Sequence, residues 1–318
     1  MIHEYAVDPA FLLELVDKQD LASSFCRALT IGSACITAGY PEDVGAKARA
    51  LALIQQESAT EPKHKAKWQE RVKQVTELAA ECTRTTTKRC NAIPWAQSFA
   101  GEHDRLPFEG ILSTREPDSD ALPHRNFDWL RSRDCHLFAC PGSRLVHRSA
   151  KNLNDALTPL LRNASMITFV DPYFFVEDRF RQTYKLYFDT IAQANHVRAE
   201  AERTIAIVCA VDTGKNSCPA DEFGNGCEES LPALLPNGLK LMIYRIRNLP
   251  SAQEIHNRYI LTDIGGVMFG HGTDSSVNAS YDNISLLDPA SLTHWKSAYT
   301  PNSSAFDWSE PPVFITPQ

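Results

Sequence analysis

The chain of 318 residues is 43% hydrophobic and 22% charged, the composition of a globular protein with one large domain or two moderate domains. Its net charge of −7 excludes a globally basic surface of the kind that attracts nucleic acid, so any contact with a polyanion has to come from a local patch. The N-terminus has no signal pattern, and no apolar run approaches the ~20 residues of a membrane span, so we expect a cytoplasmic protein.

The first part of the chain is predicted to be a mainly helical domain, residues 1–90. Asp8 and Pro9 form a helix start, and an apolar stripe of Phe11, Leu12, Leu15 and Val16 follows them. A second helix is expected over residues 41–55. The strongest helical pattern covers residues 63–82, where apolar residues recur at steps of three and four. Residues 91–144 are predicted to connect this domain to the next, with short strands at 108–112 and 136–139.

Residues 145–318 are predicted to form an α/β domain, with a mixed sheet flanked by helices. The expected elements are a helix at 145–161, a strand at 166–170, a helix at 179–203, a strand at 204–211, a polar loop at 212–229 and a strand at 239–244. Two further short strands, 259–262 and 267–269, are joined by a glycine turn.

The nine cysteines are an odd number without framework spacing, which fits a reducing compartment. Cys135 and Cys140 are far in sequence from Cys218 and Cys227, and neither pair has the tight spacing of a zinc site. We therefore expect free thiols and no metal.

The densest cluster of chemically active residues lies between His256 and Asp274. His256 and Arg258 are two positions apart, so on a strand they would point to the same face. An imidazole beside a guanidinium suits a phosphate group, because the ring can attack phosphorus or transfer a proton while the guanidinium holds two oxygens. Asp263 follows, and then Gly270 and Gly272, whose missing side chains allow backbone to approach a ligand.

This spacing resembles the phospholipase D superfamily, whose signature is His-x-Lys-x4-Asp-x6-Gly-Ser-x-Asn. His256, Asp263 and Gly270 fall on its His, Asp and Gly, whereas Arg258, His271 and Thr273 replace its Lys, Ser and Asn. The variant pattern, which continues to Asp274, is most similar to the phospholipase D-like domain at the C-terminus of the MIT-domain proteins, which bind phospholipid without cleaving it. Residues 166–173, which end in Asp171-Pro-Tyr173, resemble the first strand of that domain. The resemblance covers residues 145–318.

Two classes of function follow from this resemblance. The first is a metal-independent, cofactor-free phosphodiesterase, a cytosolic nuclease that could act as an effector in bacterial anti-phage defence. In it His256 would form a phosphohistidine and Arg258 would stabilise the oxyanions. Because the chain has one motif, an active site implies a homodimer that supplies the second histidine. The second class is a non-catalytic module that binds phosphate-bearing ligands, either acidic lipid or nucleic acid, or a protein partner.

The remaining candidate residues have structural explanations as well as functional ones. His271 is a second acid/base candidate or a strand cap, and Asp274 either orients a charged neighbour or caps a turn. Asp171 and Tyr173 follow a strand at the end where α/β folds place ligand-facing groups, although Asp-Pro is also a common strand terminator.

A local basic region lies in the helical domain, where residues 63–89 contain eight Lys or Arg and three Glu. Lys63, Lys65 and Lys67 are the candidate contacts for nucleic acid or acidic lipid. A solvated helix face explains such a pattern more often, with Trp68 packed inward. The N-terminal domain is also the candidate docking module for a protein partner.

Overall fold

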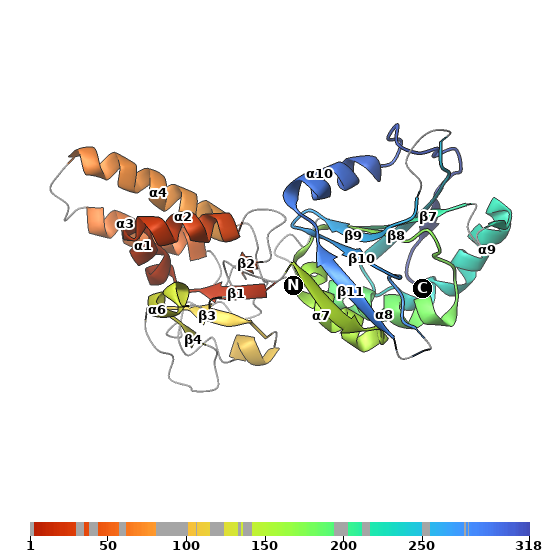
Figure 1. Cartoon of the computed structure of the whole chain (residues 1–318), viewed down its shortest axis with the longest axis horizontal. Helices are drawn as coiled ribbons and strands as arrows, with labels where there is room; N and C mark the ends of the chain where they lie inside the picture. The colour runs from red at the N-terminus through yellow and green to blue at the C-terminus, as the bar shows by residue number, and fades with distance from the viewer. Residues whose placement is uncertain are drawn as a thin grey trace. The chain divides into compact units, whose positions relative to one another are not determined.

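The computed structural model describes residues 3–29, 35–37, 44–56, 62–80, 101–105, 107–114, 124–132, 135, 142–193, 203–211, 217–249, 255–276, 278 and 280–318. The chain forms two compact units, one of Ile2–Cys140 and one of Pro141–Ala194 with Arg198–Gln318 (Figure 1). The second unit begins shortly before Leu145, where the α/β domain was predicted to start. Each unit has its own sheet.

The N-terminal unit combines helices with a four-stranded parallel sheet in the order β2-β1-β3-β4. Its elements are β1 (His3–Val7), α1 (Pro9–Asp17), α2 (Gln19–Ala28), β2 (Cys35–Thr37), α3 (Val44–Gln56), α4 (Pro62–Ala80), β3 (Gly110–Leu112), β4 (His124–Arg125) and α6 (Phe127–Arg131). The sequence predicted a helical domain that is separate from a connecting region. In the structure the two are joined in one sheet, because β1 pairs with β3 across the predicted boundary. The strand predicted at 136–139 lies outside the described residues.

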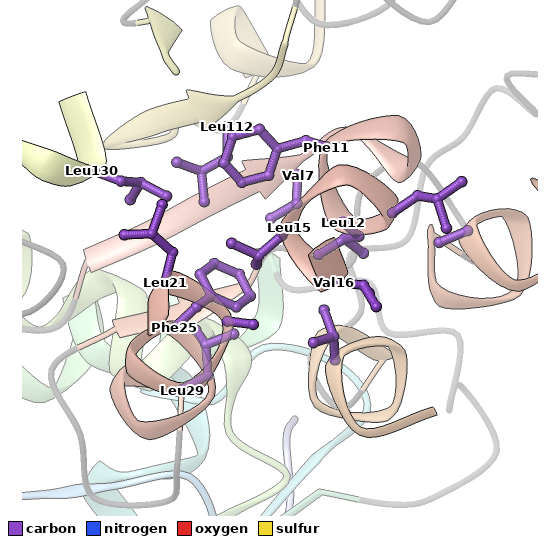
Figure 2. Close-up of a cluster of buried hydrophobic side chains, with 14 of the residues drawn as sticks. Val7, Phe11, Leu12, Leu15, Val16, Leu21, Phe25, Leu29, Leu112 and Leu130 are labelled. Atoms are coloured by element: carbon purple, nitrogen blue, oxygen red, sulfur yellow. The ribbon is translucent and has the colours of Figure 1, made fainter. Parts of the chain in front are cut away.

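The core of this unit forms where α1 and α2 pack on β1 and β3 (Figure 2). The side chain of Asp8 caps α1 by accepting a hydrogen bond from the Ala10 amide at 2.8 Å, as the Asp-Pro start predicts. The predicted stripe is buried, with Phe11, Leu12 and Leu15 fully enclosed. Trp68 of α4 is partly buried, packs against the same core and donates its indole N–H to Asp17 at 3.0 Å, so the ring takes part in the packing of this unit.

The C-terminal unit is an α/β structure with a mixed sheet, as predicted. The sheet has eight strands in the order β12-β8-β7-β6-β9-β10-β11-β5. Strands β6, β7 and β8 are parallel, and the others pair antiparallel. The elements are β5 (Ser143–His147), α7 (Ala150–Asn163), β6 (Met166–Val170), α8 (Asp178–Gln193), β7 (Arg203–Ala210), α9 (Ala220–Ser230), β8 (Leu239–Ile246), β9 (Arg258–Thr262), β10 (Gly266–Phe269), β11 (Tyr281–Leu286), α10 (Pro289–Ala298) and β12 (Val313–Ile315).

Helices cover both faces of this sheet (Figure 1). On one face, Phe169 of β6 stacks with Tyr187 of α8, which packs beside α7. On the other face, Tyr259 of β9 stacks with Trp295 of α10. Because successive residues of a strand point to opposite faces, Arg258 lies on the α8 side.

Two predicted elements are wrong. The helix expected over 145–161 is split, because residues 143–147 pair with β11 as an edge strand and Ser149 then caps α7. The segment expected to be a loop over 212–229 contains helix α9. Phe223 and Cys227 are one turn apart and buried, so they form a short apolar stripe on this helix. Gly224 and Gly226 lie between them and weaken the helical pattern in the sequence.

Among the described residues, no helix has the length and apolar character needed to cross a membrane.

Candidate functional site

A pocket of about 400 Å³ lies in the C-terminal unit where several chain segments end together. They are the end of β5, the end of β6, the start of α8, the start of β9 and the loop after β10. Three guanidinium groups, two carboxylates, two aromatic rings and one imidazole face it: Arg148, Arg179 and Arg258, Asp171 and Asp274, Tyr173 and Phe180, and His271, together with Gly270 and Gly272. Seven of the residues predicted from the sequence are therefore brought together here.

Arg258 is the first residue of β9, and its side chain reaches the pocket along the face of α8. Its guanidinium carbon lies 4.7 Å from the centre of the Tyr173 ring, a cation–π contact that positions the group without neutralising it. The Nε atom is buried, and no described residue forms a hydrogen bond with it. Arg258 therefore presents a preorganised cation to the pocket.

Asp274 connects the other two arginines. Its Oδ1 atom lies 3.1 Å from Arg148 Nη2 and its Oδ2 atom 3.1 Å from Arg179 Nη1. Burial raises the pKa of Asp274, and the neighbouring Asp171 raises it further, against the lowering effect of the two arginines. This carboxylate thus offsets part of the positive charge of the pocket.

Asp171 anchors the loop after β10 and is only 1% exposed. Its Oδ2 atom accepts hydrogen bonds from the amide and the hydroxyl of Thr273, at 3.0 and 2.8 Å, and its Oδ1 atom accepts one from the Tyr173 amide. With both oxygens engaged, Asp171 positions the loop and Tyr173. A contact with a ligand would have to compete with these bonds.

His271 and Asp282 form a dyad at the edge of the pocket. The buried Asp282 carboxylate of β11 accepts from the amides of Gly270 and His271, at 3.0 and 3.1 Å, and lies 3.3 Å from His271 Nδ1. Because a carboxylate only accepts, Nδ1 carries the proton in this contact and Nε2 keeps its lone pair. A Cβ atom at Gly270 would lie 2.8 Å from Asp282 Oδ1, so this position requires glycine.

Two of the residues expected to be catalytic lie elsewhere. His256 precedes β9, is exposed and is not among the residues that line the pocket. Asp263 follows the opposite end of β9, where its side chain accepts hydrogen bonds from the amides of Ser165 and Met166. Its contacts join β9 to the start of β6 and do not reach the pocket.

The basic region belongs to the other unit. Lys67 is exposed on α4, whereas the side chains of Lys63 and Lys65 lie outside the described residues.

Sequence reasoning missed Arg148, Arg179 and Asp282. Arg148 and Arg179 come from segments that are distant in sequence from the motif, so its spacing could not reveal them, whereas Asp282 follows the motif closely but is not part of its pattern. Asp282 gave a usable signal, since it stands two residues before Ile284 on the buried face of an alternating strand, and a buried carboxylate there needs partners.

No group of three or more His, Cys, Asp and Glu side chains within the described part of the chain is arranged to hold a metal ion. The pocket instead presents donors to an anion, and it carries one imidazole that can accept a proton.

Comparison with known proteins shows no family relationship. No family model matches the sequence, and no curated protein matches it. Among solved structures, one match is TrmBL2, described as an archaeal chromatin protein with a novel mode of DNA binding. It is 14% identical, the match covers 50% of this chain and 50% of that one, and the TM-score is 0.26. A likeness of this degree carries no argument about fold or function.

Proposed function

We propose that the C-terminal unit is a phospholipase D-like module whose pocket binds the phosphate group of a ligand. The observation that carries this proposal is Arg258, whose guanidinium faces the pocket, lies over the Tyr173 ring and has a buried Nε without a partner among the described residues. A planar guanidinium can donate two parallel hydrogen bonds to phosphate oxygens, so the group is suited to this ligand.

The charges around Arg258 support the same function. Arg148 and Arg179 share the carboxylate of Asp274, and Arg179 also pairs with Glu177 at 3.2 Å. Arg258 is the lining arginine for which the described residues provide no carboxylate partner, so it is the cation left for a bound anion.

Phosphate binding tests the proposal directly. Titration calorimetry with inorganic phosphate at fixed ionic strength is expected to show binding to the wild type and a loss of roughly 10- to 100-fold in affinity for Arg258→Gln, because a charged hydrogen bond contributes about 1.5–3 kcal/mol. Arg144→Gln is the matched control, since Arg144 is exposed on β5 and does not line the pocket. Equal affinities of the two variants would contradict the proposal.

A second candidate function, phosphodiester hydrolysis, is supported by the His271–Asp282 dyad. In this reaction His271 Nε2 takes a proton from a water molecule, and the water oxygen attacks phosphorus. The bond to the leaving alcohol then breaks, and the alkoxide takes a proton from solvent. Arg258 would stabilise the charge on the remaining oxygens.

An activated aryl phosphodiester suits the test, because its leaving group needs no acid. With bis(4-nitrophenyl) phosphate, His271→Ala is expected to abolish release of nitrophenol while phosphate binding stays. His256→Ala is the control, since His256 is exposed outside the pocket lining. If His256→Ala is inactive and His271→Ala is active, the reaction runs instead through the predicted His256 nucleophile.

A further inference from the structure

Tyr173 is an exposed aromatic residue on a rigid backbone. Its side chain is 42% exposed although large apolar groups are mostly buried in this unit. The backbone around it is fixed, because the Tyr173 amide donates to Asp171 and the following residue, Phe174, is 1% exposed and donates its amide to the Asp171 carbonyl. The ring is therefore held at the pocket without contributing much to the core.

The second aromatic residue of the pocket behaves differently. Phe180 is 2% exposed and packs against Phe174, so it belongs to the core beneath the pocket. Arg179 covers it at 4.8 Å. Of the two aromatic side chains that line the pocket, Tyr173 is thus the one available to a ligand.

The contact with Arg258 limits what Tyr173 can bind. The guanidinium covers one part of the ring at 4.7 Å, so the exposed remainder of the ring is left for a second flat group. A flat apolar group stacks on such a ring, and the neighbouring cation holds a negative charge beside it. A ligand that stacks on Tyr173 and also places a negative charge beside Arg258 has an aromatic ring system close to a phosphate.

We propose that the pocket binds a nucleotide unit of single-stranded nucleic acid, with the phosphate on Arg258 and the base stacked on Tyr173. The inference rests on the proposed phosphate binding and adds the class of ligand. An acidic phospholipid offers the same phosphate without an aromatic group, so it would leave the exposed ring of Tyr173 unused. Stacking on an aromatic ring tolerates any base, since every base has a π-face.

The experiment measures binding of a short oligothymidylate and of an abasic strand of the same length to the 318-residue chain by fluorescence anisotropy. The wild type is expected to prefer the strand with bases by about tenfold or more. Tyr173→Phe keeps the ring and should keep this preference. Tyr173→Leu should lose it: both strands lose the affinity that the contact between Tyr173 and Arg258 contributes, and the ratio of their affinities falls to about one.

The outcomes separate this inference from the proposed function. Equal binding of the two strands by the wild type, or an unchanged preference in Tyr173→Leu, overturns base stacking while phosphate binding by Arg258 stands. Binding to vesicles of acidic phospholipid but not to oligothymidylate also overturns it. If inorganic phosphate does not bind at all, both proposals fail. If circular dichroism shows that Tyr173→Leu is unfolded, the wild-type affinities for the two strands test base stacking by themselves, and equal affinities overturn it.

Discussion

Replacement of Gly272 by alanine probes the packing of the pocket loop most directly. A Cβ atom built at this position would lie 2.5 Å from Asp274 Oδ1 and 3.1 Å from Arg148 Nη2. Neither group can move away freely, because Asp274 is 2% exposed and is held by Arg148 on one side and Arg179 on the other. The added methyl group therefore has to displace the loop or separate the ion pair.

The expected loss of stability follows from these contacts. Overpacking of a well-packed site costs about 1–3 kcal/mol, and separation of a buried ion pair would bring the loss toward about 3–5 kcal/mol. In a unit of this size a loss of about 2–3 kcal/mol lowers the Tm by roughly 4–12 °C. Phosphate affinity should fall as well, since Arg148 and Arg179 both line the pocket.

The measurement is scanning calorimetry of the full chain, with hydrogen exchange to locate the change in the loop after β10. Gly226→Ala is the matched control, because a Cβ atom there meets nothing within 4 Å and the residue lies inside helix α9. Alanine at that position should raise stability by about 0.5–1 kcal/mol. If Gly272→Ala has the same Tm as Gly226→Ala and the same phosphate affinity as the wild type, the packing argument is refuted.

Three further predictions address charge and chemistry. Because the pKa of Asp274 is raised in the folded protein, its contribution to stability is full below the unfolded value of about 3.9 and is lost as the pH rises through the folded pKa. Urea unfolding at a series of pH values should therefore show wild type losing stability relative to Asp274→Asn across that window, and a constant difference would contradict the shift. If the basic region binds a polyanion, Lys63, Lys65 and Lys67 changed to Gln should weaken oligonucleotide binding regardless of sequence and reduce its log–log salt slope by up to about one unit for each phosphate that is no longer neutralised, whereas an unchanged slope would favour a solvated helix face. Any hydrolysis through a histidine should persist in EDTA, and loss of activity that Mg²⁺ restores would point to a different reaction.

The sequence predicted the central strands of the larger sheet, where buried residues leave a clear hydrophobic pattern. The strands β6, β7 and β8 lie close to their predicted bounds, because β6 and β7 are largely apolar runs and β8 alternates buried residues with less buried ones, both of which are recognisable strand patterns. Edge strand β5 was missed, since three of its five residues are exposed and its helix-like spacing continues into α7. Local pattern therefore describes the centre of this sheet better than its edge.

The site was predictable in part for a different reason. Arg258, Gly270 and His271 come from one hairpin and its loop, so spacing in the sequence is close to spacing in the fold. The interpretation of His256 assumed a strand through that position, whereas β9 begins only at Arg258 and the Asn257 side chain donates to the Tyr259 hydroxyl. The partner Arg148 depends on the pairing of β5 with β11, which no local pattern encodes, whereas Asp282 stands at a buried position of an alternating strand and left a signal in the sequence.

The order of the strands has a consequence for how the site appears during synthesis. Edge strand β5 is the first strand of its unit in the chain, yet it pairs only with β11. The contact between Arg148 and Asp274 correspondingly spans 126 positions. Such distant pairings form late, because the chain has to close a long loop before they can stabilise it. A nascent chain that has not yet released β11 from the ribosome has no partner for β5 and no Asp282 beneath His271, so the pocket is assembled only when translation of the unit is nearly finished.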